Sequence, residues 1–348
     1  MSKNKKSFWT TKNPECLGFN RSKLLKAGTF IADKSSGNPY RITIVHQGKI
    51  VVEWYYRIDA YKNLNQGSIT ESILCSLLGI TISEKIIRSI NDKVGDYYPE
   101  FVQNSNVGLP QKHPYLPNTS ITFHHLISGL YKDTPIFVTP KQQLPLKRCG
   151  MNILSHAIAA NYNLYKTEHP DKGAGIGALA KWKIMNPIGL EATWKYKSIF
   201  DPSTTINEAI FGHKIFFYMN SRNMAKLGLL WLNYGNWQGQ QIIPTKWVQN
   251  ATSVPKEAFK EESPEQHKLG LGFWSNSKGK MWPNLPNDSF ASIGNNKQHI
   301  WVCPSLDLVV VQSPGVYDEF VNTNYAVANF CAATQEDFLF QIVDSLQQ

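Results

Sequence analysis

The chain has 348 residues, of which 42% are hydrophobic and 12% aromatic, a composition typical of a globular protein with a large core. No apolar run approaches the roughly 18 residues of a membrane span, and residues 1–6 lack the apolar core of a signal peptide. We therefore expect a cytoplasmic protein with no membrane partner. The net charge of +10 comes from scattered lysines and arginines, which argues against a nucleic-acid partner.

The five cysteines are widely spaced, and none forms a Cys-x-x-Cys pair. This pattern predicts reduced, mostly buried thiols rather than a disulfide framework or a zinc site. The adjacent His124 and His125 lack a carboxylate or cysteine at metal-binding spacing. We expect no metal and no cofactor, and the sequence does not indicate an oligomeric state.

Two strand pairs are predicted near the ends of the chain, at residues 41–45 with 50–56 and 299–303 with 306–312. Apolar periodicity predicts helices over residues 70–90, 152–161, 174–186, 221–233 and 335–346. The predicted fold class is α/β of the α+β type, in which both chain ends build one antiparallel sheet, flanked by helices, around an inserted helical lobe.

These elements predict one folded unit over residues 40–348, preceded by an N-terminal extension over residues 1–39. The sheet subdomain is expected to comprise residues 40–66 and 265–348. The helical lobe is expected to comprise residues 67–264.

The segment from Gly67 to Ile73 reads Gly-Ser-Ile-Thr-Glu-Ser-Ile and has two interpretations. Ser68 and Glu71, followed by apolar residues, match a capping box at the start of an amphipathic helix. Alternatively, Ser68 is a nucleophile and Glu71 its base, because three residues along a helix bring the two side chains to the same face.

Several blocks of the chain, taken in order, resemble the class C β-lactamase-like hydrolases of the serine β-lactamase and penicillin-binding-protein superfamily. The blocks are residues 44–55, 67–73, 90–100, 121–130, 184–189, 221–230, 239–247 and 307–311. The similarity covers roughly residues 40–346. It implies a β-lactamase-like fold with its nucleophile at Ser68.

The catalytic motifs of that family are degenerate in this chain. The family's nucleophile segment reads Ser-x-x-Lys, whereas Glu71 takes the place of the lysine here. Its Tyr-x-Asn motif, counted back from Gly150, falls on Leu146 and Arg148, and leucine cannot carry a proton. Tyr162 lies at the far end of the same predicted helix. The resemblance therefore implies a retained pocket without classical Ser-Lys-Tyr hydrolysis.

The family's third motif, Lys-Thr-Gly or His-x-Gly on a strand, corresponds to Ser292-Ile293-Gly294. Gly294 retains the close backbone approach, and Ser292 leaves a hydroxyl where a cation often lies. A glycine-rich stretch of the relatives is replaced by residues 213–218. The substrate-binding residues implied by these positions are Leu146, Arg148, Phe216, Phe217, Tyr218, Ser292 and Gly294.

These features favour a small-molecule-processing enzyme with Ser68 and Glu71 as catalytic residues. Glu71 would act as a general acid or base in a cyclisation, isomerisation or elimination of a biosynthetic pathway. One alternative is a serine hydrolase or acyltransferase that acylates Ser68 with an altered base. Another is a non-catalytic binding protein, or pseudo-hydrolase, because one fold can host unrelated functions. A small-molecule substrate is expected, but neither it nor its pathway can be read from the sequence.

Overall fold

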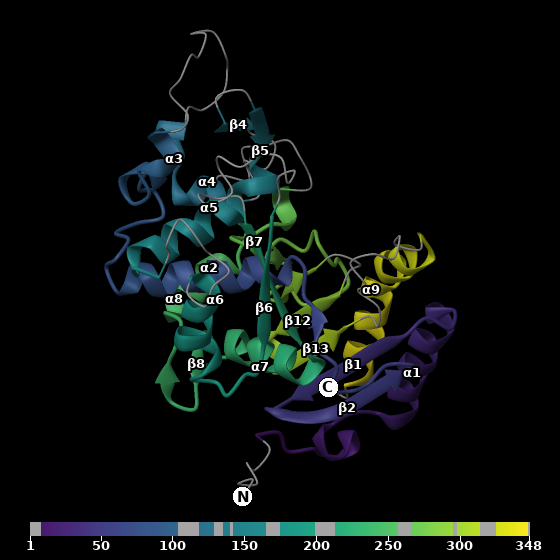
Figure 1. The fold of residues 1–348 in the computed structure, drawn as a ribbon. Coiled ribbons are helices and arrows are strands. Elements are labelled where there is room, and N and C mark those ends of the chain that lie inside the picture. Colours follow the sequence, from purple (N-terminus) through teal and green to yellow (C-terminus); the bar gives the residue numbers. More distant parts are fainter. Residues whose placement is uncertain are drawn as a thin grey trace, which may run out of the picture.

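The computed structural model describes residues 8–103, 118–128, 135–139, 142–164, 175–198, 213–256, 266–294, 298–313 and 325–346. In these residues a large sheet with flanking helices lies beside a lobe made mainly of helices (Figure 1). This is the α+β architecture that the sequence predicts. Among the helices of these ranges, none combines the length and apolar character needed to cross a bilayer.

The large sheet is antiparallel and unites strands from both ends of the chain. Its strands, in their spatial order, are β10 (Trp274–Ser275), β11 (Phe290–Ile293), β12 (His299–Cys303), β13 (Leu308–Gln312), β1 (Tyr40–His46) and β2 (Lys49–Tyr56). β1 pairs with both β2 and β13, and Ile44 lies opposite Val310. The predicted union of the two strand pairs in one sheet is confirmed.

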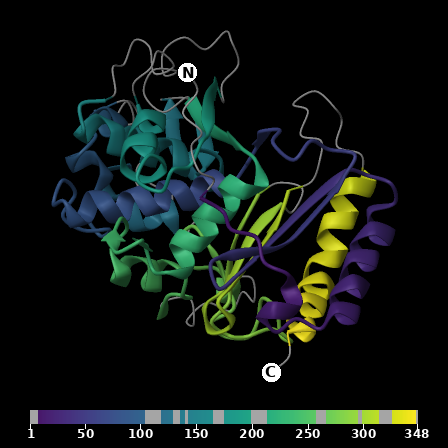
Figure 2. The ribbon, with the colours of Figure 1, turned by 90° about the horizontal axis from the view of Figure 1, so that it is seen from below.

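Helices cover both faces of this sheet. Figure 2 shows α1 (Arg21–Ser35) and α9 (Tyr325–Ser345) side by side along one face, where their apolar side chains meet Ile42 and Val310. α7 (Ser221–Leu232) packs on the other face against β1, β12 and β13. The alternation of side chains along each strand supplies an apolar surface to both helical layers.

α1 lies within residues 1–39, the segment expected to be an extension. Its residues Leu24, Ala27 and Ile31 are each no more than 4% exposed and belong to the same core as Phe338 of α9. Their spacing of three and four residues places them on one face of the helix. The N-terminal segment therefore contributes to the core that closes the sheet.

The helical lobe is built around α2 (Ile69–Ser83). The other helices described there are α3 (Glu100–Gln103), α4 (Phe123–Ile127), α5 (Leu146–Asn161), α6 (Ile176–Ala180), a π-helical stretch (Lys181–Met185) and α8 (Thr245–Ala251). Its described strands form a sheet ordered β3 (Leu64–Asn65), β7 (His213–Met219) and β6 (Thr193–Ser198), and the hairpins β4 (Pro135–Thr139) with β5 (Gln142–Pro145) and β8 (Asn236–Trp237) with β9 (Gln240–Gln241).

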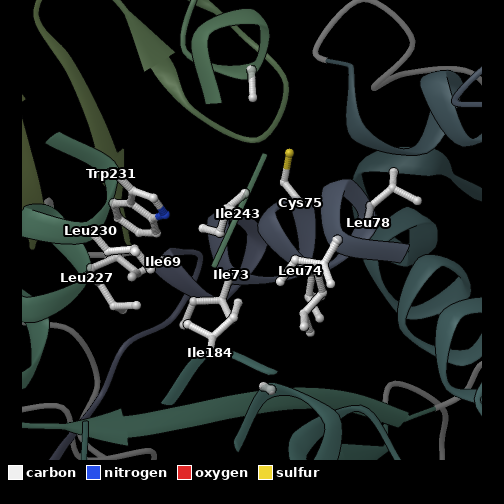
Figure 3. Packing of buried hydrophobic residues seen from close by; sticks show 14 of the residues in the cluster. Ile69, Ile73, Leu74, Cys75, Leu78, Ile184, Leu227, Leu230, Trp231 and Ile243 are labelled. Carbon is white, nitrogen blue, oxygen red and sulfur yellow. The ribbon is translucent and has the colours of Figure 1, made fainter. Parts of the chain in front are cut away.

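α2 is shorter than predicted but is buried almost throughout. It ends at Ser83 rather than near residue 90, because Lys85 adopts a left-handed backbone with φ of 60°. Figure 3 shows its side chains meeting those of neighbouring elements, among them Ile184, Trp231 and Ile243. Burying one large aliphatic side chain contributes about 1.5–3 kcal/mol, so this packing fixes the first turn of α2 firmly.

A partly buried ion pair joins the start of α7 to β2. Arg222 donates from Nε to Glu53 Oε1 at 2.7 Å and from Nη2 to Glu53 Oε2 at 2.6 Å, and Tyr55 donates to the same carboxylate. Burial alone would raise the pKa of Glu53, but the hydrogen bonds from Arg222 and Tyr55 outweigh burial and lower this pKa. The bidentate geometry holds α7 against the sheet.

We expect the stability of the protein in acid to depend on Glu53. Because its pKa is lowered by folding, its contribution is present above the unfolded value, about 4.3, and is lost as the pH falls through the folded value. Glu53→Gln should lower the free energy of unfolding by about 1–2 kcal/mol at neutral pH and flatten its decline below about pH 5, measured by urea unfolding.

The matched control for this prediction is Glu15→Gln, which removes an exposed carboxylate 3.9 Å from Arg21. Exposed pairs contribute little, so this variant should follow the wild-type profile. If Glu53→Gln also declined in parallel with the wild type, Glu53 would not be the group that sets the acid limit.

Candidate functional site

Ser68 lies at a tight junction between a strand and a helix. β3 ends at Asn65, the chain turns at Gly67, and α2 begins directly after Ser68. Gly67 has a φ of 53°, in the left-handed region that glycine adopts at least cost. The Gly67 amide donates to Asn65 Oδ1 at 2.9 Å, and the Gln66 amide donates to Phe217 O at 2.9 Å. These hydrogen bonds fix the backbone that carries Ser68.

The capping box that the sequence suggests at Ser68 and Glu71 is not formed, so that interpretation is wrong. Ser68 has helical dihedral angles, φ −71° and ψ −4°, and its hydroxyl makes no capping hydrogen bond. A side-chain cap normally needs an extended backbone at this position to bring the hydroxyl to the second or third amide. Both side chains are half-buried, and neither has a hydrogen bond or ion pair with the described residues.

The hydroxyl of Ser68 and the carboxylate of Glu71 are therefore available to a ligand, one helical turn apart. A carboxylate can take a proton from a bound molecule and return it, and a hydroxyl can donate or accept a hydrogen bond. Among the described residues, no group of three or more histidine, cysteine or acidic side chains could hold a metal ion. The chemistry that this pair can supply is proton transfer or, at Ser68, nucleophilic attack.

Ser292 lies on β11, and its hydroxyl is hydrogen-bonded to a serine of α2. It is only 1% exposed, and its Oγ lies 2.7 Å from Ser72 Oγ, which is also 2.6 Å from Gly272 O. These contacts fasten the second turn of α2 to β11 and to the segment before β10. Sequence reasoning missed Ser72, because nothing in its local pattern indicates a partner 220 positions away.

Gly294 makes the close backbone approach that the sequence predicts. A Cβ atom at this position would lie 2.6 Å from Gln66 O, nearer than real contacts allow. The Gly294 amide donates to Gln298 O at 2.8 Å, and Gln298 Nε2 donates to Asn65 O at 2.9 Å. The structure thus brings the third motif to the turn that carries Ser68.

The segment at the position of the Tyr-x-Asn motif opens α5. Leu146 and Arg148 lie in the first turn of this helix, which packs against α2. Tyr162 follows the other end of α5, and its hydroxyl donates to Glu84 Oε2 at 2.7 Å. Glu84 follows the last residue of α2, 16 residues after Ser68 and therefore about 24 Å from it along the helix axis, so Tyr162 binds at the end of α2 opposite to Ser68.

The three consecutive aromatic residues of β7, Phe216, Phe217 and Tyr218 (the aromatic run), are divided between two faces, because side chains alternate along a strand. Phe217 is 0% exposed and packs in the core with α2 and α5. Phe216 and Tyr218 are half-buried on the other face. Tyr218 lies opposite Asn65 of β3, three residues before Ser68. The structure therefore places one end of the run beside the candidate site and places Phe217 in the core.

Solved structures of low sequence identity have the same fold. A protein from Bacteroides dorei DSM 17855 assigned as a β-lactamase aligns with a TM-score of 0.62 at 13% identity, over 94% of this chain and 99% of its own. A penicillin-binding-protein homologue from Caulobacter crescentus gives 0.59 at 11%, over 91% and 98%. EstCE1, described as a hydrolase with promiscuous acyltransferase activity, gives 0.57 at 10%, over 93% and 97%.

No protein-family model matches the chain, and comparison with curated proteins finds no match. Below 25% identity, the structural similarity establishes the fold alone, which confirms the resemblance at that level. The chain has the fold of the serine β-lactamases and penicillin-binding proteins, a fold also used by esterases.

Proposed function

We propose that this protein is a small-molecule-processing enzyme on a β-lactamase-like scaffold, in which Glu71 acts as general acid or base. The supporting observation is that Ser68 and Glu71 are half-buried, lie one turn apart and have no partner among the described residues. A carboxylate in this place suits cyclisation, isomerisation or elimination, in which a proton is taken from one atom of the substrate and returned to another.

The departures from the family motifs favour this chemistry over classical hydrolysis. Acyl transfer needs a base for the serine and donors or positive charge near the developing oxyanion. Glu71 can accept the serine proton, but it adds negative charge where the family has a lysine. Leu146 offers no proton at the tyrosine position. The substrate is expected to be a small molecule of a biosynthetic pathway.

The second candidate is a serine hydrolase or acyltransferase that acylates Ser68. It is favoured by the tight turn at Gly67, which presents Ser68 at the start of a helix, and by the Ser68 hydroxyl, which has no partner among the described residues. A non-catalytic binding protein would use the same groups only to hold a ligand. Of the three candidates, only the hydrolase or acyltransferase forms a covalent bond at Ser68.

We expect no covalent adduct on Ser68 after incubation with benzylpenicillin or with a fluorophosphonate, measured by intact-mass spectrometry. Because Glu71 and Leu146 replace the lysine and tyrosine of the family motifs, the hydroxyl should react no faster than an ordinary surface serine. A class C β-lactamase treated in parallel is the positive control, and Ser68→Ala is the control for labelling elsewhere. Stoichiometric labelling that disappears in Ser68→Ala would favour the hydrolase over the proposed acid-base enzyme.

A further inference from the structure

One face of the paired strands β6 and β7 gathers aromatic and lysine side chains. Thr193 lies opposite Tyr218 and Lys195 opposite Phe216, so these residues share a face. Lys214 lies two residues before Phe216 and belongs to the same face. Thr193 and Lys195 are exposed, and the other three are half-buried. We call these five residues the lysine-aromatic face.

The two lysines of this face lie over its aromatic rings. Lys195 Nζ is 5.4 Å from the ring centroid of Tyr218, and Lys214 Nζ is 5.5 Å from that of Phe216. Neither β6 nor β7 contains an aspartate or glutamate, and neither lysine has an ion-pair partner among the described residues. The face therefore presents positive charge that no carboxylate on these strands neutralises.

Lys183 also lies over an aromatic ring, but its charge is neutralised by a carboxylate. Lys183 Nζ lies 4.0 Å from the ring centroid of Trp182, but it also binds Glu84 Oε1 at 2.6 Å. The positive charge of Lys183 is therefore already paired with Glu84. The lysines of the lysine-aromatic face also lie over aromatic rings, but they have no acidic partner among the described residues, so their charge is available to an anionic ligand.

The lysine-aromatic face ends at the segment that carries Ser68. Tyr218 lies opposite Asn65, and the amide of Gln66 donates to Phe217 O at 2.9 Å. β7 lies between β6 and β3 in the small sheet of the lobe, and β3 leads directly into the Ser68 turn. A molecule bound along β7 at this end would therefore lie next to the turn that presents Ser68.

We infer that the substrate carries an aromatic carboxylate group and that the lysine-aromatic face binds this group. This inference rests on the proposed function, because it names the substrate class of that site. The choice of ligand follows from complementarity. Lys195 and Lys214, which have no acidic partner in the part of the chain that the structure describes, attract the carboxylate, and the side chains of Phe216 and Tyr218 offer apolar contact to a flat ring. A neutral ligand of the same shape would gain only the aromatic contact.

The test compares 2-naphthoate with its neutral analogue 2-naphthamide by isothermal titration calorimetry on the full chain. We expect naphthoate to bind at least about fivefold more tightly, and raising the salt concentration to weaken only naphthoate. Lys195→Gln and Lys214→Gln should each weaken naphthoate about two- to fivefold and leave naphthamide unchanged. Lys246→Gln, at an exposed lysine on α8, removes the same charge elsewhere and should bind as the wild type does.

Equal affinity for the two probes, no binding of either, or an equal effect of Lys246→Gln would overturn the inference.

Failure of the proposed function gives a different result. If naphthoate binding depended on Lys195 but turnover did not depend on Glu71, the anion site would hold and the acid-base role would not. If turnover depended on Glu71 while the probes bound equally, the substrate class would be wrong and the proposed function would hold.

Discussion

Replacing Glu71 by glutamine is expected to lower turnover of the natural substrate by about 100-fold or more, because a positioned acid or base contributes about 10²–10⁴-fold. Folding should change little, since the carboxylate has no hydrogen bond or ion pair with the described residues. The measurement is incubation of the purified protein with a small-molecule extract, followed by mass spectrometry for compounds that only the wild type consumes.

Two further variants show whether a loss of turnover in Glu71→Gln reflects acid-base catalysis. Ser68→Ala should reduce turnover less than Glu71→Gln, because it removes one hydroxyl and no proton-transfer group. Glu84→Gln, at the other end of α2, disturbs a carboxylate bonded to Lys183 and Tyr162 and should leave turnover unchanged. An inactive Ser68→Ala beside an active Glu71→Gln would indicate nucleophilic catalysis instead. Turnover unaffected by both would move the site toward residues 216–218.

The second large effect is expected from Gly294→Ala. The added carbon would lie 2.6 Å from Gln66 O, a backbone atom that cannot move without displacing the turn before Ser68. Overpacking of this kind costs about 1–3 kcal/mol of folding free energy, and it should also displace Ser68. We therefore expect Gly294→Ala to be less stable in urea unfolding and to lose most of its turnover.

Gly28→Ala is the matched control for Gly294→Ala. Gly28 lies within α1, where the three atoms nearest to the added carbon belong to the side chain of Trp54, the nearest at 3.2 Å, and not to the backbone. Alanine also has the higher helix propensity, so stability should be kept or slightly increased. Wild-type stability and turnover in Gly294→Ala would show that β11 and the Ser68 turn are not held rigidly together.

Much of the fold follows from local patterns and from the order of the family-like blocks. The strands at both chain ends are recognisable because each is a run rich in β-branched residues, and short turn segments separate the runs. The end of α2 is not recognisable, since Lys85 breaks the helix with a left-handed backbone while the apolar pattern continues through Ile86 and Ile87. Neither glycine nor proline marks this boundary, so the predicted helix runs too far.

The sequence predicts that Ser68 and Glu71 lie at the start of a helix, but it does not predict the contacts of the surrounding residues. Ser68 and Glu71 satisfy the capping-box pattern, yet the backbone at Ser68 is helical and the box is not formed. Ser292 was expected to offer its hydroxyl to a substrate, and the structure shows this hydroxyl bonded to Ser72. Both outcomes depend on the path of the backbone and on pairing between distant segments, which local sequence does not encode.

The sheet built from both chain ends has a consequence for how the protein folds during synthesis. Arg41 Nη2 donates to Ser313 Oγ at 2.9 Å, across 272 positions of sequence. Closing a loop of this length adds little equilibrium cost, because the entropy penalty grows only with the logarithm of loop length. The delay is kinetic: while the ribosome makes the intervening lobe, β1 has β2 but not β13, and α1 lacks α9. This unpaired edge of β1 is the surface most exposed to aggregation and to chaperones before the last strand arrives.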